Sequence, residues 1–283
     1  MINLQLPHWF IELFRKLLIS DVIEQLPGKK LEEILALSEA DAPKLFGIAS
    51  ALALEESAEA RSMAYEVASR LVEIFGTSSP TVITAADIVL SRLGNFPGRT
   101  LLRQRYRSTQ ELAPRAPARL ALERIMREVE NSVDGPNSQP VALTDFQYTL
   151  YDKLDRFSSV SVSAPTSAGK SFVLGIDLVR RLKKTEPACV VYVVPTRALI
   201  REVTFEIRKH LRDADLESVP VRSVPFPISP NEAPRGAVYV LTQERLMSFL
   251  HSRQGTPWIT TLIVDEAQSI RDEARGVILQ SAI

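Results

Sequence analysis

One short segment of the chain combines the residue types that hold phosphate. It reads Ala164-Pro-Thr-Ser-Ala-Gly-Lys-Ser171. Gly169 lets the backbone pass close to a polyphosphate, Lys170 can reach the β- and γ-phosphates, and Ser171 offers a hydroxyl to Mg²⁺. The residues that we expect to bind ATP in this loop are Thr166, Ser167, Ala168, Gly169, Lys170 and Ser171.

The flanking sequence predicts how this loop is held. The β-rich run Val160–Ser163 precedes it, and the helical pattern Phe172–Leu182 follows it. A strand that leads through a tight loop into a helix aims successive N–H groups at one spot, which suits a polyphosphate. The general phosphate-loop pattern starts with glycine, and Ala164 stands at that position in this chain.

A pair of carboxylates could complete the site. The run Trp258–Val264 is apolar and β-rich, and Asp265 and Glu266 follow it directly. A strand that ends in two acids places both at the carboxyl edge of a parallel sheet, where α/β folds bind ligands. Asp265 can then hold Mg²⁺, and Glu266 can orient or polarise the attacking water.

These groups need a parallel sheet to position them, and residues 141–283 predict one. Short β-rich runs alternate with helical stretches there, at Val160–Ser163, Cys189–Val194, Val219–Val224, Val238–Leu241 and Leu262–Val264. Strands that alternate with helices predict an α/β domain whose sheet is mostly parallel and flanked by helices on both faces.

Residues 1–130 predict an all-helical accessory domain, either a small bundle or a docking module. Apolar residues recur there at helical spacing. The predicted helices include residues 50–75, 85–93 and 117–129. Residues 131–140 are turn formers with almost no apolar content, which predicts a linker between the two domains.

Charge is balanced overall but unevenly distributed. The formal net charge is +0, so no overall basic field indicates nucleic acid. Acidic residues dominate residues 1–60, whereas residues 99–127 are rich in arginine. These arginines either form a phosphate-binding arm, pair with the acidic first segment, or simply face solvent.

Several classes of protein are disfavoured by composition. Cys189 is the only cysteine, so no internal disulfide forms, and a reducing, cytoplasmic setting is expected. One cysteine and three histidines make a structural zinc site improbable. No run approaches the roughly 20 apolar residues of a membrane span, and we expect no membrane partner.

The motifs together resemble superfamily two DEAD-like (DEAD/DEAH-box-type) helicases. Residues 164–171 resemble their motif I, in which alanine is normal at the first position. Asp265-Glu-Ala-Gln268 resembles motif II, with glutamine in place of the usual Asp or His. Val194–Leu199 resembles motif Ia, and Leu241–Arg245 resembles motif Ib. The resemblance implies a RecA-like P-loop domain with ATP and Mg²⁺ as cofactors, and it does not extend to residues 1–130.

The resemblance also implies roles for individual residues. Gln147 matches the glutamine that reads the adenine edge, and Gln268 would couple the ATP site to later motifs. Thr196, Arg197, Thr242 and Arg245 align with positions that contact the nucleic-acid backbone of DNA or RNA; the alternative roles are helix capping and surface charge. The implied catalytic residues are Lys170, Asp265, Glu266 and Gln268, and the implied metal ligands are Ser171 and Asp265.

Taken together, the motifs predict an ATP hydrolase that acts as a helicase or translocase. In this family ATP is hydrolysed between two RecA-like lobes, and the chain stops at Ile283 without a second lobe. We therefore expect an N-terminal fragment that is weak or inactive in isolation. The alternative is a nucleotide-binding switch or scaffold that recruits a partner through its helical domain. A small-molecule kinase is disfavoured by the elements that resemble motifs Ia and II.

The combination of a helical N-terminal region with Asp-Glu-Ala-Gln is also similar to helicase subunits of bacterial anti-phage systems such as Hachiman. This similarity implies antiviral defence and an effector or nuclease protein as a partner.

Overall fold

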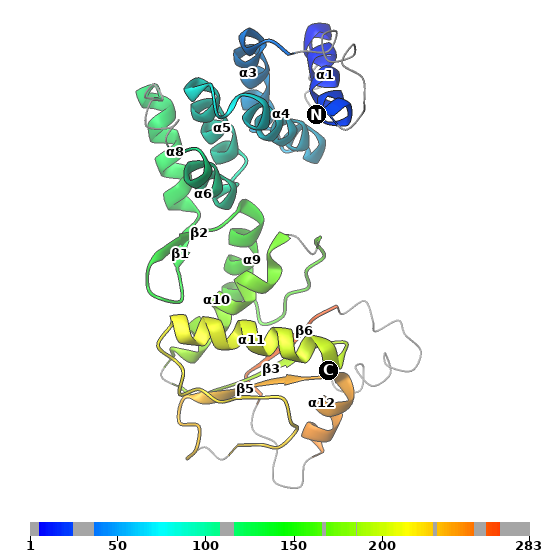
Figure 1. The fold of residues 1–283 in the computed structure, drawn as a ribbon. Helices are drawn as coiled ribbons and strands as arrows, with labels where there is room; N and C mark the ends of the chain where they lie inside the picture. Colours follow the sequence, from blue (N-terminus) through cyan, green and yellow to red (C-terminus); the bar gives the residue numbers. More distant parts are fainter. Residues whose placement is uncertain are drawn as a thin grey trace. The chain divides into compact units, whose positions relative to one another are not determined.

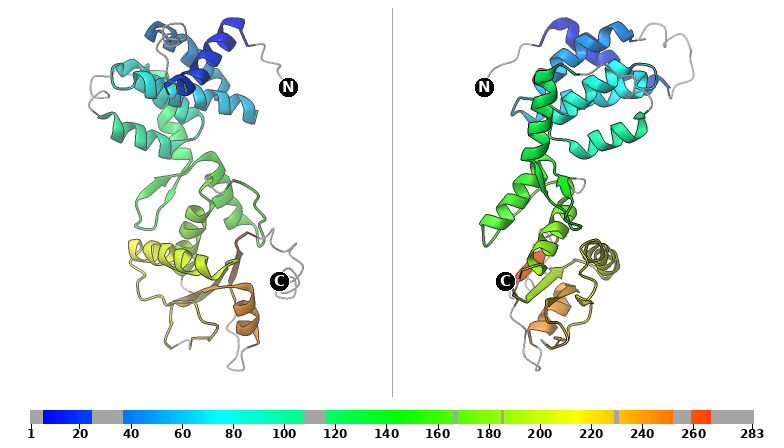
Figure 2. Two further views of the ribbon diagram at one scale, coloured as in Figure 1. Left: turned by 45° about the vertical axis from the view of Figure 1, so that its right-hand side comes forward. Right: turned by 90° about the vertical axis from the view of Figure 1, so that its left-hand side faces the viewer.

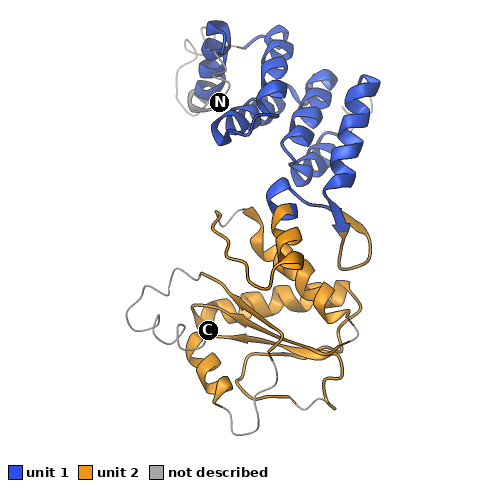
Figure 3. Cartoon of the chain, turned by 180° about the vertical axis from the view of Figure 1, so that it is seen from behind, with its two compact units in different colours: residues 1–133, 142–148 blue, residues 134–141, 149–283 orange. Residues whose placement is uncertain are grey.

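The computed structural model describes residues 6–24, 37–107, 116–165, 168–184, 186–228, 231–251 and 259–266. The chain divides into two compact units, which Figure 3 colours separately. Unit 1 comprises residues 1–133 and 142–148, and unit 2 comprises residues 134–141 and 149–283. Among the described helices, none is both long enough and apolar enough to cross a membrane.

Unit 1 is built from helices. They are α1 (His8–Glu24), the 3-10 helix η1 (Glu39–Asp41), α3 (Ala42–Leu52), α4 (Ala58–Phe75), α5 (Pro80–Arg92), α6 (Phe96–Arg105) and α8 (Ala118–Glu130). Figures 1 and 2 show α3, α4 and α5 packed side by side. Leu45, Leu71 and Ile83, one from each of these helices, are fully buried in the shared core.

Local capping explains where the helices begin. The predicted helix over residues 50–75 is wrong as one element, because a turn separates α3 from α4. The hydroxyl of Ser57 accepts a hydrogen bond from Ala60 N at 3.4 Å and so starts a new helix. Helix α6 was not predicted, although Asn95 caps it by accepting from Gly98 N at 3.0 Å.

Several arginines of the stretch 99–127 form ion pairs inside unit 1. The buried carboxylate of Asp87 accepts from Arg99 Nε at 2.9 Å and from Arg124 Nη1 at 2.7 Å. The guanidinium of Arg103 lies 3.5 Å from the same carboxylate. Burial raises the pKa of Asp87, but these three arginines outweigh it and hold the pKa below the ordinary 3.8. The buried Arg99 is therefore not available to a phosphate, and the three arginines tie α5, α6 and α8 together.

Residues 131–140 contain strands rather than an irregular linker. Strands β1 (Ser132–Asp134) and β2 (Pro140–Ala142) form a two-stranded sheet. Gly135 N donates to Gln139 O at 2.9 Å and closes the turn between them. The turn formers that suggested a linker are the same residue types that a tight hairpin requires. Helix α9 (Asp145–Arg156) follows the hairpin.

Unit 2 contains the predicted parallel sheet. Its strands are β3 (Ala188–Val193), β4 (Val221–Arg222), β5 (Gly236–Leu241) and β6 (Thr261–Val264). Their order across the sheet is β4-β5-β3-β6, and every pairing is parallel. The expected α/β class, with helical segments followed by a RecA-like parallel-sheet domain, is confirmed.

Helices cover both faces of this sheet. Helices α10 (Lys170–Leu182) and α11 (Arg197–Asp213) share a core with Val190 and Tyr192 of β3. Helix α12 (Gln243–Leu250) packs on the opposite face, against Val191 and Val193. Successive residues of β3 thus face different helices, which is why its sequence is a continuous apolar run.

The predicted strand Val160–Ser163 is wrong. These residues have no strand assignment, and Val162 is exposed. A strand exists only where a neighbour completes its hydrogen-bond ladder, and the described residues include no such pairing for this segment. The phosphate loop is therefore approached by a segment that has no regular secondary structure and lies outside the described sheet.

We predict that Asp87→Asn lowers the free energy of unfolding of unit 1 by about 3–5 kcal/mol, because it removes the buried charge partner of the Arg99 guanidinium and leaves Arg99 only the exposed Glu128. Chemical denaturation followed by circular dichroism measures this. The matched control is Glu66→Gln, which breaks the i,i+4 pair with Arg70 and is expected to cost under about 0.5 kcal/mol. Equal losses in both variants would contradict the assignment.

The same carboxylate gives a defined pH dependence. Because the folded pKa of Asp87 lies below its ordinary 3.8, its contribution is complete at neutral pH. The contribution is lost as the pH falls below 3.8 and through the lowered pKa of the folded state. Unfolding at a series of acidic pH values is expected to show this loss in the parent chain and not in Asp87→Asn.

Candidate nucleotide-binding and catalytic site

Three strands of unit 2 end at the same level. In the parallel register, Val193 of β3 lies opposite both Leu241 of β5 and Val264 of β6. The residues that follow these strands therefore emerge together at the carboxyl edge of the sheet. They include Thr196 and Arg197 after β3, Thr242 and Arg245 after β5, and Asp265 and Glu266 after β6. This is the edge at which α/β folds bind ligands.

The phosphate loop enters α10 through a glycine in a left-handed conformation. Gly169 is the N-cap of α10 with φ 74° and ψ 31°. A side chain is disfavoured in this region, so the glycine is required by the backbone path. The first N–H groups of α10 have no partner within the helix, which makes its N-terminus favourable for an anion.

Lys170 and Ser171 open this helix. The ammonium group of Lys170 donates to the carbonyl oxygen of Ala164, and to that of Pro165 at 3.0 Å. These carbonyls carry only partial charge, so a phosphate would be a stronger partner for the same ammonium. Within the described residues, Lys170 makes no ion pair with Asp265 or Glu266. Ser171 is exposed. Thr166 and Ser167 lie outside the described residues.

The acidic pair has one partner that the sequence did not reveal. Asp265 N donates to Val193 O at 3.0 Å, which extends the β3–β6 ladder by one residue. The carboxylate of Asp265 accepts from Glu266 N at 3.0 Å. Burial and the nearby charge of Asp265 raise the pKa of Tyr192. Tyr192 thus stays protonated beside the predicted metal ligand.

The second acid, Glu266, is exposed, and its backbone takes φ 51°. Such a left-handed conformation is uncommon for glutamate and turns the chain sharply after β6. Gln268, the remaining motif II residue, lies outside the described residues.

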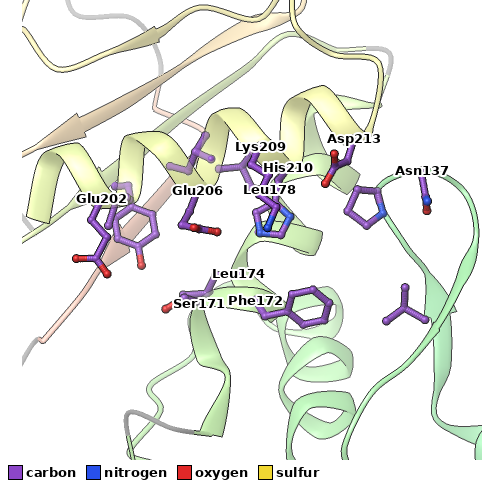
Figure 4. Close-up of a pocket in the computed structure, with 16 residues that line it drawn as sticks. Asn137, Ser171, Phe172, Leu174, Leu178, Glu202, Glu206, Lys209, His210 and Asp213 are labelled. Carbon is purple, nitrogen blue, oxygen red and sulfur yellow. The ribbon is translucent and has the colours of Figure 1, made fainter. Parts of the chain in front are cut away.

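A cavity of about 400 Å³ lies beside the start of α10 (Figure 4). Ser171 and Tyr192 both line it, so the predicted metal-binding hydroxyl and the tyrosine beside Asp265 share one cavity. Helix α11 contributes Glu202, Glu206 and His210 to its wall. Burial lowers the pKa of His210 despite the nearby charges of Glu206 and Asp213.

The two residues expected to contact nucleic acid after β3 are exposed. The hydroxyl of Thr196 accepts from Leu199 N at 3.4 Å and caps α11. Arg197 is the first residue of α11. Thr196 therefore has the capping role that we considered as its alternative. Because Thr196 is also exposed, it remains accessible to a nucleic-acid backbone.

The two residues after β5 are more enclosed. Thr242 is buried at the N-cap of α12, and its side chain makes no capping bond. Arg245 is partly buried, and its Nη1 donates to Ser223 O at 2.6 Å. Arg245 therefore holds the segment after β4 in this structure.

Gln147 belongs to unit 1 and has a structural role that the sequence pattern could have revealed. Gln147 N donates to the hydroxyl of Thr144 at 3.2 Å, and Thr144 N donates to Gln147 Oε1 at 3.0 Å. This reciprocal pair is a capping box at the start of α9. The side chain is buried rather than on the helix surface, which was its alternative placement.

The segment that carries Gln147 is anchored to the helices of unit 1 through Asp145. Its carboxylate accepts from Arg61 at 3.0 Å, from Arg127 at 3.1 Å and from Asn131 at 2.9 Å. Sequence reasoning missed this hub, because no local pattern indicates which distant arginines a carboxylate will meet.

The fold and the phosphate loop define the class of unit 2: it is a RecA-like domain. Residues 144–283 match the model of the DEAD/DEAH box helicase family. This part of the chain is therefore similar to the helicase domains of that family. No solved structure matches the chain.

Several helicases are similar to the same region. The ATP-dependent DNA helicase Hel308 of Thermoplasma acidophilum is 30% identical over 143 residues, which are 49% of this chain and 20% of the relative. The DExH-box ATP-dependent RNA helicase DExH9 of Arabidopsis thaliana is 31% identical over 51% of this chain and 14% of its own length. The ATP-dependent RNA helicase mtr4 of Schizosaccharomyces pombe is 30% identical over 51% of this chain and 12% of its own length. The matches span a fifth or less of these relatives.

We predict that Gly169→Ala lowers the free energy of unfolding of unit 2 by about 1–2 kcal/mol, because alanine is strained in the left-handed region. The matched control is Gly47→Ala in α3, where an added Cβ meets no heavy atom within 4 Å. That control is expected to stabilise unit 1 by about 0.5–1 kcal/mol. Thermal unfolding of both variants measures the contrast, and stabilisation by Gly169→Ala would show that the loop does not need its glycine.

Proposed function

We propose that residues 141–283 are the first RecA-like lobe of an ATP-dependent helicase or translocase, and that the lobe binds Mg-ATP together with part of a nucleic-acid backbone. The observation that most supports this is the shared carboxyl edge of β3, β5 and β6. That edge gathers the predicted nucleic-acid residues and the acidic pair in one place.

The residues of the phosphate loop fit ATP. Among the described residues, Lys170 donates to two backbone carbonyls, so its ammonium charge is available to phosphate oxygens. In the proposed complex Gln147 reads the adenine edge, and residues 166–171 surround the phosphates. Ser171 and Asp265 would hold Mg²⁺, which when bound would neutralise charge on the phosphates.

The remaining catalytic roles belong to the acidic motif. Asp265 lies close enough to Tyr192 for its charge to raise the pKa of that phenol. Glu266 is exposed and would orient the attacking water, and Gln268 would relay the state of the ATP site. In related phosphoryl transfers an arginine finger contributes about 10³–10⁵ in rate. We propose that hydrolysis here depends on such an arginine from a second RecA-like lobe.

The nucleic-acid contact is proposed for Thr196, Arg197, Thr242 and Arg245. The exposed pair, Thr196 and Arg197, would meet the backbone first, since Arg245 is bonded to Ser223. The choice between DNA and RNA depends on 2′-hydroxyl contacts and on duplex shape, so both are substrates to be tested. A cytoplasmic setting and an anti-phage role with an effector or nuclease partner remain sequence-based hypotheses. A neighbouring nuclease or effector gene would support the latter.

Lys170→Ala tests the nucleotide site. Removing the ammonium group is expected to raise the dissociation constant for ATP about tenfold or more, because charge-assisted bonds to phosphate are lost. The matched control is Lys184→Ala, an exposed lysine just beyond the far end of α10, which is expected to bind ATP as the parent does. Isothermal titration with Mg-ATP measures both. Unchanged affinity in Lys170→Ala would overturn the site.

ATP turnover separates the helicase lobe from the alternative, a nucleotide-binding switch or scaffold. We expect this chain to bind ATP and to hydrolyse it slowly, with or without nucleic acid. Steady-state turnover is measured with single- and double-stranded DNA and RNA. Strong stimulation by one of them would exclude the scaffold and identify the substrate, while binding without any response in the full-length protein would favour the scaffold.

A further inference from the structure

Helix α8 presents its apolar side chains to solvent. Leu122, Ile125, Met126 and Val129 are between 53% and 68% exposed. Their spacing of i, i+3, i+4 and i+7 places them on one face of the helix. A helix at a protein surface normally turns such a stripe inward, and no residue of α8 is buried.

The charged face of α8 points into unit 1 instead. Glu123 is bonded to Arg92 at 2.7 Å, and Arg124 is bonded to Asp87 at 2.7 Å. Further along the helix, Arg127 is bonded to Asp145, and Glu128 to Arg99. Rotating α8 to bury the stripe would break all four pairs and leave the buried Asp87 and Arg99 with fewer partners. The outward orientation is therefore fixed by the fold.

The two ends of the stripe carry opposite charges. Arg119 precedes Leu122 by three residues, Glu130 follows Met126 by four, and both are exposed. With 3.6 residues per turn, they lie on the same flank of the apolar stripe. If two copies of α8 pair antiparallel about a twofold axis, Arg119 of each copy meets Glu130 of the other.

We propose that the face of α8 formed by Leu122, Ile125, Met126 and Val129 is a self-association surface that docks against the same face of a second copy of this chain. A twofold interface requires a self-complementary patch, and an apolar stripe with a cation at one end and an anion at the other meets that requirement. Helix α8 lies at the edge of unit 1 and packs on α5, which leaves this face accessible (Figure 1).

One helix pair buries less than the roughly 1,600 Å² of a standard interface, so the dimer is weak, with a dissociation constant on the order of micromolar. The apolar contact is tested with Ile125→Glu, which places a charge at the centre of the stripe. Sedimentation equilibrium of the intact chain is expected to show a monomer–dimer equilibrium whose dissociation constant rises about tenfold or more in the variant. Because Ile125 is exposed and not part of the core, the variant is expected to fold, and circular dichroism verifies this.

The matched control is Leu101→Glu on α6, where the leucine is 66% exposed but lies off the stripe. It is expected to dimerise as the parent does. A parent chain that stays monomeric up to roughly millimolar concentration overturns the proposal. So does equal weakening by Ile125→Glu and Leu101→Glu, because the contact would then not be specific to α8.

A charge swap tests the antiparallel geometry independently. Arg119→Glu and Glu130→Arg each place like charges opposite one another and are expected to weaken the dimer, by on the order of two- to thirty-fold for two exposed pairs. The double variant restores the pairs with reversed sign and is expected to recover the affinity of the parent. A double variant weaker than either single variant contradicts antiparallel pairing, and a parallel or unrelated arrangement would then replace it.

Discussion

The parallel pairing of β3 with both β5 and β6 is the constraint on which the site of unit 2 depends. Because Val193 lies level with Leu241 and with Val264, three chain segments leave the sheet at one edge. Each segment then turns into the element that carries a motif. Residues from distant parts of the sequence meet because strand register brings them together, and the ladder continues into the motifs where Val194 N donates to Leu241 O at 2.9 Å. The charge of Asp265 also acts on Tyr192 of the neighbouring strand and contributes to the raised pKa of its phenol.

The parts of this arrangement that depend on local sequence could be predicted. Strands β3, β5 and β6 were expected nearly at their observed bounds, because strands buried on both faces are continuous apolar runs. Val160–Ser163 alternates valine with serine, and only a pairing partner could decide its state. Tyr192 escaped notice for a related reason: in the sequence it is one more large residue in a buried strand, and its function comes from the neighbour that β6 supplies.

Unit 1 departs from the usual rule that helices bury apolar faces and expose charged ones. Its α3–α5 core follows the rule, and the sequence predicted most of α4 and the second half of α5 but not α3. Helix α8 obeys the opposite rule, because Asp87 and Asp145 need arginine partners that α8 provides. Periodicity alone predicts that a helix exists and which residues share a face. Periodicity does not predict which face of the helix points inward when carboxylates such as Asp87 and Asp145 on neighbouring helices form ion pairs with its charged residues.

The anchoring of residues 142–148 in unit 1 bears on how the chain can be dissected. Leu143 is fully buried, Asn131 bonds its carbonyl, and Asp145 is bonded by Arg61 and Arg127. The capping box of Thr144 and Gln147 lies within this anchored segment. A truncation at the hairpin, which sequence alone would recommend as a clean domain boundary, would strip Leu143 of its packing and Asp145 of its arginines. Residues 142–148 therefore fold as part of unit 1, together with the helices that precede them.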